Sequence, residues 1–191
     1  LVSDSYALDR VIEIKEQPSY EGQTLVSQSV GMDADAHVLS LALAESGKIN
    51  LVSLQYIDFR AAKDEDPEIK EQGILKTSES LSLAGADANT RGILVGQDWY
   101  FVVGNKVYTS PVLKPQLADL TTLPDDLGVP VAVAVTSKET HLIIATYDAG
   151  SSHENKGSFA LVDLTTKEVK VHRNVMGKCV VAKGYDANPW F

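Results

Sequence analysis

Apolar positions in the C-terminal half of the chain repeat with the two-residue period of β-strands. The clearest stretch predicts four strands, at 129–135, 141–147, 159–164 and 168–172, separated by turn or loop segments rich in Ser, Thr, Gly and Asp. The earlier strands are apolar on both faces, whereas Val169 and Val171 in the last strand alternate with polar residues. This change predicts an antiparallel meander whose early strands are central and whose last strand lies at an edge.

Weaker copies of this unit occur upstream. Residues 37–44 and 48–57 form a predicted hairpin, and residues 99–103 and 106–108 form another across the two-residue turn Gly104–Asn105. A short strand at 93–95 precedes the second hairpin. We therefore expect three similar β units along the chain.

The unit length favours a propeller over other all-β folds. Four strands in about 44 residues match the usual blade repeat of ~40–50 residues, and Ala132 and Ala134 would let a neighbouring sheet approach closely. We predict one all-β domain over residues 1–191, a propeller-like array of antiparallel meander blades with about four blades or a partial propeller. A β-sandwich, which also has short, evenly spaced strands, is the alternative. Short helical turns are expected on connections at 64–73 and 114–120.

Composition narrows the class of protein. The 191 residues include 26 Asp and Glu against 17 Lys and Arg, a formal charge of −9, with 44% hydrophobic residues. This is the composition of a folded domain, and its acidic balance argues against nucleic-acid binding. No apolar run approaches the roughly 20 residues of a transmembrane helix. Cys179 is the only cysteine, which excludes an internal disulfide and a multi-cysteine metal site, and we expect a buried thiol.

Catalytic and metal-binding motifs are not found in the sequence. The four histidines are scattered, and neither a nucleophile elbow nor a glycine-rich phosphate loop occurs, so we expect no catalytic residues, no cofactor and no enzymatic activity. None of the acidic runs has the spacing of an EF-hand loop, and solvated loop charge is their default interpretation. Asp33 and Asp35 alternate on one strand face and are the best-placed candidates for Ca²⁺.

Aromatic residues near strand ends are the candidate binding residues. Such rings stack on sugar faces or contact a protein partner when exposed, and pack in the core when buried. Tyr147–Asp148 closes a strand into the longest loop of the clear meander, a position where loops often carry binding sites. The complete candidate set is Trp99, Tyr100, Tyr147, Asp148, Tyr185 and Trp190.

The region from Trp99 to Gly184 resembles a known family. The segments that carry the resemblance are Val103–Tyr108, His141–Asp148, Gly157–Asp163 and Gly177–Val181. They are similar to the propeller-like C-terminal region of PKD-like surface lipoproteins of Gram-negative gut anaerobes. The resemblance implies an extracytoplasmic location in the cell envelope, in the periplasm or on the outer surface, and a role in surface binding or polymer capture. It also implies a lipid anchor in a segment preceding Leu1, although no lipobox is visible in this chain.

Three hypotheses follow. The first is a non-enzymatic binding or scaffolding module for a glycan, another polymer or a protein partner. The second is a glycan-active hydrolase or lyase whose carboxylates converge from different strands. The third is a structural segment that packs against other parts of a larger surface lipoprotein, for which large apolar surface patches would be expected.

Overall fold

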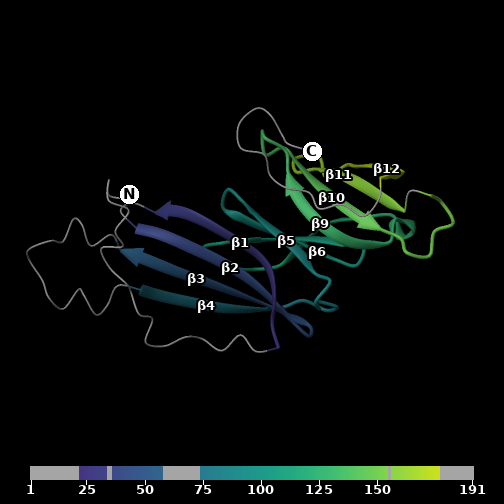
Figure 1. The fold of residues 1–191 in the computed structure, drawn as a ribbon. Coiled ribbons are helices and arrows are strands. Elements are labelled where there is room, and N and C mark those ends of the chain that lie inside the picture. The colour runs from purple at the N-terminus through teal and green to yellow at the C-terminus, as the bar shows by residue number, and fades with distance from the viewer. Residues whose placement is uncertain (1–21, 34–35, 58–73, 155, 177–191) are drawn as a thin grey trace, which may run out of the picture.

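The computed structural model describes residues 22–33, 36–57, 74–154 and 156–176, and these residues form an all-β structure (Figure 1). Apart from a single 3-10 turn, η2 at Asp125–Leu127, every regular element in this part of the chain is a strand. The strands are β1 Thr24–Asp33, β2 Ala36–Glu45, β3 Lys48–Ile57, β4 Ile74–Ser82, β5 Arg91–Val95, β6 Asp98–Val103, β7 Lys106–Pro111, β8 Ala118–Thr122, β9 Val129–Val135, β10 His141–Tyr147, β11 Gly157–Asp163 and β12 Val169–Met176.

The strands form three four-stranded antiparallel meanders, none of which is closed. We call β1–β4 the first sheet, β5–β8 the middle sheet and β9–β12 the last sheet; in each, strands adjacent in sequence are paired. The four strands predicted over 129–172 are confirmed, as are both upstream hairpins and the edge position of β12. The prediction of a central position for the earliest strand is wrong, because β9 pairs with β10 alone and packs against β5 of the middle sheet instead.

The predicted helical turn at 114–120 is also wrong. Residues from Ala118 onward belong to β8, the outer strand of the middle sheet, where Tyr108 pairs with Asp119. The predicted turn at 64–73 and Cys179 lie outside the described residues.

The sheets stack face to face, with the first strands of each in contact. β1 contacts β5, and β5 contacts β9, so the middle sheet lies between the other two (Figure 1). One hydrophobic cluster fills the space between the first and middle sheets; its buried members are Ala42, Ala44, Ile49, Leu51, Leu83, Ala86, Trp99 and Phe101. A second cluster lies between the middle and last sheets; its buried members are Val95, Val102, Val107, Leu123, Leu127, Val135, Leu142, Ile144, Ala160 and Val162.

Gly92 allows β5 to approach β1 and β6 closely. A Cβ atom placed on this residue would lie 2.7 Å from Val26 Cγ1 and 2.9 Å from Phe101 Cδ1. It would also lie 3.1 Å from the backbone oxygen of Tyr100, which cannot move away without distorting β6. No side chain larger than hydrogen fits at this position without displacing one of these atoms.

We therefore expect Gly92→Ala to destabilise the domain by about 1–3 kcal/mol, the usual cost of overpacking a core. Gly150→Ala is the matched control, because its Cβ would lie 3.4 Å from Asp148 Oδ1, an ordinary contact. This control should change the free energy of unfolding by no more than about 0.5 kcal/mol. Urea denaturation of both variants measures the difference, and equal stabilities would contradict the packing argument.

Candidate functional site

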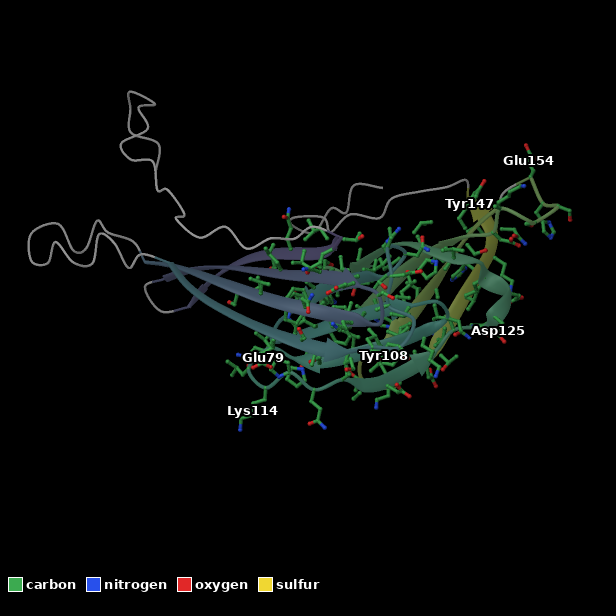
Figure 2. The ribbon with its side chains drawn as sticks, turned by 90° about the horizontal axis from the view of Figure 1, so that it is seen from below. Glu79, Tyr108, Lys114, Asp125, Tyr147 and Glu154 are labelled. Carbon is green, nitrogen blue, oxygen red and sulfur yellow. The ribbon has the colours of Figure 1, made fainter. Side chains whose placement is uncertain are left out.

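Loops from all three sheets gather at one end of the stack, which we call the loop end. It consists of the connections at 46–47, 83–90, 104–105, 123–128 and 148–156. Backbone hydrogen bonds join neighbouring connections: Gly47 N donates to Ala86 O at 3.0 Å, and Leu123 N donates to Asn105 O at 2.7 Å. Figure 2 shows Asp125, Tyr147 and Glu154 at this end of the molecule, away from Lys114. The stack therefore presents a composite surface built from three sheets.

The longest of these connections begins at Asp148 and is ordered by its own polar groups. Asp148 N donates to Lys156 O at 3.0 Å, which closes the loop, and Asp148 Oδ1 accepts a hydrogen bond from Gly150 N at 2.9 Å. Lys156 Nζ donates to Ala149 O at 2.9 Å. The Asp148 carboxylate thus orders its own turn, as Asp commonly does at such positions. Tyr147, half-buried, ends β10 immediately before it.

Gly128 supports this loop from the neighbouring connection. Its φ of +80° lies in the left-handed region, which glycine adopts without steric cost. A Cβ atom here would also lie only 2.6 Å from Tyr147 O and 2.7 Å from Asp148 N. The close approach of Gly128 to this backbone fixes where β10 ends and the loop begins.

The turn η2 ties the loop end to the outermost strand of the last sheet. Leu127 is buried in the core and anchors the turn, while Asp125 and Asp126 are exposed. Arg173 on β12 donates two hydrogen bonds to Asp126, Nε to Oδ2 and Nη2 to Oδ1, both at 3.0 Å. This bidentate geometry orients both side chains, although an exposed pair adds little stability.

The same pair shifts both titrations. The hydrogen bond and charge of Arg173 lower the pKa of Asp126, and Asp126 in turn raises the pKa of Arg173. Asp125 accepts a second, separate hydrogen bond from Asn105 Nδ2 of the middle sheet. The two adjacent carboxylates therefore bind different sheets and hold the 123–128 connection in place.

Carboxylates dominate the exposed charge of the loop end. Asp87, Asp125, Asp126 and Glu154 are exposed, and Asp148 is half-buried. Asp126 is paired with Arg173, and the side chain of Lys156 is turned to a backbone carbonyl. This surface combines hydrogen-bond acceptors with the Tyr147 ring, a combination suited to ligands rich in hydroxyl or amide donors.

The predicted binding residues have different locations. Tyr147 and Asp148 are both at the loop end, as expected from their place after a strand. The expectation that the Trp99 ring is exposed is corrected by its burial, since Trp99 is 2% exposed. Its ring stacks with Phe101 between the first and middle sheets, at a centroid distance of 6.0 Å, and is therefore not at the surface. Burial between sheets explains this, since β6 is covered on both faces.

Tyr100 lies on the opposite face of β6 and packs against the second cluster. Burial, followed by the negative charge of Asp98, raises the pKa of Tyr100. Asp35, Tyr185 and Trp190 lie outside the described residues, and of Asp33 only the backbone, at the end of β1, is described. Within the described residues, no group of three or more His, Cys, Asp or Glu side chains is placed to hold a metal ion.

One polar cluster was not predicted from the sequence. His141 Nδ1 lies 2.9 Å from Thr140 Oγ1, and His141 Nε2 lies 3.4 Å from Asp163 Oδ2, at the end of the last sheet opposite the loop end. His141 and Asp163 are direct cross-strand partners, so the register of β10 and β11 is the signal that would have found them.

The order hydroxyl, imidazole, carboxylate is that of nucleophilic sites, but here the groups stabilise turns. Asp163 Oδ1 accepts hydrogen bonds from Thr165 N and Thr166 N, both at 2.7 Å. These two bonds, from Thr166 first, lower the pKa of Asp163. Thr140 N donates to Thr136 Oγ1 at 3.3 Å within the preceding turn.

Comparisons with known proteins assign no family. No protein-family model and no curated protein matches the chain. Among solved structures, an ACO/RPE65 chimera is 10% identical, with a TM-score of 0.44 and coverage of 80% of this chain and 39% of that one. The tricorn protease is 9% identical, with a TM-score of 0.38 and coverage of 86% and 19%. The chain thus spans about two fifths and one fifth of these proteins, and both TM-scores are too low to carry an argument. No helix in the described residues is long and apolar enough to cross a membrane.

We expect Gly128→Ala to loosen the loop that begins at Asp148. The added methyl group would collide with the backbone of Tyr147 in addition to straining the positive φ. Gly104→Ala is the matched control, since its φ is +57° but nothing lies within 4 Å of the added Cβ. Amide hydrogen exchange at Asp148 should become faster in the first variant only. Equal exchange at Asp148 in the two variants would contradict the role of the Gly128 contact in ordering this loop.

We expect Arg173→Met to raise the pKa of Asp126 toward its ordinary value, because the hydrogen bonds and positive charge that lower it are lost. A lowered pKa favours the folded state above the ordinary carboxyl pKa, and that contribution is lost as the pH falls through the lowered value. Carbon-detected NMR titration measures the pKa of Asp126 in both proteins. Asp163 is the internal control, because backbone N–H groups are the main cause of its lowered pKa. An unchanged pKa of Asp126 in the variant would contradict Arg173 as the cause of the lowered pKa.

Proposed function

We propose that the three sheets are blades of a propeller-like array and that the domain is a binding or scaffolding module. Two observations support the array: the first strand of each meander lies against the first strand of the next, and each meander then runs outward in sequence order. Blades of a propeller are four-stranded meanders arranged radially in this way. Such arrays present their loops at two ends, where ligands bind.

The convergence of loops from all three sheets at one end is the observation that carries the binding role. Tyr147, Asp125 and Glu154 all lie at that end (Figure 2), and the backbone there is ordered by Gly128 and by hydrogen bonds between connections. A half-buried ring on the same surface as several carboxylates suits a glycan or another hydroxyl-rich polymer, since rings stack on sugar faces and carboxylates accept from hydroxyl groups. A protein segment rich in amide or basic groups is the other partner with this chemistry.

The proposed location is the cell envelope, outside the cytoplasm. The resemblance of the Trp99 to Gly184 region to PKD-like surface lipoproteins supports it, and a lipid anchor preceding Leu1 belongs to the same proposal. The −9 charge is compatible with this setting, because the carboxylates of the loop end are mostly exposed to solvent. Sequencing of the full-length precursor tests the anchor: a signal segment with a lipobox cysteine supports it, and a cytoplasmic start contradicts it.

We expect Tyr147→Ala to weaken binding to an immobilised glycan array by about tenfold, the effect of losing one stacked ring. Tyr147→Phe should retain most of the affinity, because the ring remains. Lys114→Ala is the control, since Lys114 lies away from the loop end (Figure 2). Binding curves from biolayer interferometry on array hits measure these effects.

Two experimental results would contradict the proposal of a binding module. No hit on the array and no specific partner in a pull-down would contradict a binding module. Shortening of a bound glycan, detected by mass spectrometry, would instead support the hydrolase or lyase hypothesis, with loop-end carboxylates as its acids.

A further inference from the structure

Arg91, the first residue of β5, has a guanidinium group whose hydrogen bonds go to backbone carbonyls. Nε donates to Val131 O at 3.1 Å, and Nη1 donates to Ala88 O and Thr90 O, both at 2.9 Å. No described residue accepts a hydrogen bond from Nη2, and no carboxylate of the described chain forms an ion pair with this group. The side chain is nevertheless half-buried. Its charge therefore has no counter-ion among the described residues.

This arrangement is unexpected in a chain with a formal charge of −9. Asp87, the acidic residue nearest to Arg91 in the sequence, instead accepts hydrogen bonds from the backbone and side-chain nitrogens of Asn89. Arg173, the other arginine of the described chain, forms a bidentate pair with Asp126. A partly buried cation is usually paired, and a neutral amide would suffice as a donor to a carbonyl. The backbone contacts thus account for two of the three guanidinium nitrogens of Arg91 and leave its charge unexplained.

The three carbonyls also hold the guanidinium in one orientation. Because Nε and Nη1 are fixed on Val131, Ala88 and Thr90, Nη2 has a fixed position before any ligand binds. A guanidinium forms strong, directional hydrogen bonds to a carboxylate, and an ordered donor loses little freedom on binding. Nη2 of Arg91 is therefore suited to one anionic group.

Arg91 lies at the loop end, close to the strands that carry Tyr147. It follows the 83–90 connection, and its partner Val131 is on β9. Val129, two residues before Val131, is 51% exposed and is the cross-strand partner of Tyr147 on β10. Strand geometry places Tyr147 about 7 Å along β9 from Val131 and about 5 Å across to β10. A short oligosaccharide can therefore contact both Arg91 and Tyr147.

The carboxylates around this site restrict the kind of anion that it accepts. Asp87, Asp125 and Glu154 are exposed at the same end, so a ligand with many negative charges would be repelled. A ligand with one carboxylate among neutral hydroxyl groups meets Arg91 with its charge and the acidic side chains with its hydroxyl groups.

We propose that Arg91 Nη2 binds the carboxylate of a uronic acid in an otherwise neutral glycan, while Tyr147 stacks on a neighbouring sugar. This assignment rests on the proposed function, because it names the class of glycan bound at the loop end.

A disaccharide of glucuronic acid and xylose tests the assignment against its carboxyl-reduced form, in which glucose replaces glucuronic acid. Isothermal titration calorimetry on the 191-residue chain should show about tenfold tighter binding of the acidic form, as expected for a hydrogen bond to a charged group. This preference should shrink at high salt, and heparin, a polyanion, should not bind.

Arg91→Met should abolish the preference for the acidic disaccharide. Lys106→Met is the matched control, since Lys106 is an exposed cation at the same end and its loss changes the net charge equally. Because Arg91→Met also removes the donors to three carbonyls, a second measurement uses the wild-type protein. The Arg91 Nε–Hε signal in a nitrogen-15 NMR spectrum should move when the acidic disaccharide is added, and the Arg173 signal should not.

The outcomes separate this assignment from the proposed function. Equal affinity for the two disaccharides would overturn the role of Arg91 and leave the binding module standing, whereas binding of neither would contradict both. Loss of the preference in Lys156→Met but not in Arg91→Met would place the anion site at Lys156 and overturn the assignment. Displacement of the acidic disaccharide from Arg91 by an equimolar acidic peptide would overturn the glycan as the ligand class.

Discussion

The middle sheet must be apolar on both faces, and the rest of the structure depends on that constraint. In β6, Trp99 and Phe101 face the first sheet, while Tyr100 and Val102 face the last one. Since side chains alternate strictly along a strand, a slip of one residue would exchange the two sets and disrupt both cores at once. The same strand thus fixes the positions of both neighbouring sheets, and neither core can be altered without affecting the strand that serves the other.

Because the middle sheet is packed on both faces, the first strands β1, β5 and β9 lie close together. This close packing requires particular residues on these strands. Gly92 gives β1 room to approach, and Arg91 beside it binds the backbone: its guanidinium donates to the carbonyls of Ala88, Thr90 and Val131. Val131 is the residue of β9 left without a cross-strand partner at a bulge. A buried or half-buried carbonyl freed from a ladder requires a donor, and Arg91 supplies one from the adjacent sheet.

Whether a strand could be predicted from the sequence depends on whether one or both of its faces are covered by other parts of the protein. Strands β9 to β12 were predicted because the first three are short runs that are apolar on both faces, the last alternates, and most of the turns between them are short. β1 and β4 were not predicted because they carry Ser, Gln, Lys and Glu, as strands with one solvated face do. Tyr147 and Asp148 were predicted at a loop because they end a clear strand. The burial of Trp99 could not be predicted, since alternation separates two faces without showing that both are covered. The pairing of His141 with Asp163 required the register of β10 and β11.

Strand faces and loops have separate roles in this architecture, and that separation explains why the loop end can carry many polar and charged groups at little cost in stability. The cores are formed by side chains that alternate along strands, whereas Asp125, Asp126 and Asp148 are on connections where their charges remain hydrated. Order at that end comes from Gly128, from the Asp148 turn and from the bidentate bond between Asp126 and Arg173. The last of these joins the connection between β8 and β9 to β12, the outermost strand of the last sheet, so the loop surface is held across the full width of that sheet. A loop surface positioned this way is fixed by the sheets beneath it, while its side chains can change without altering either core.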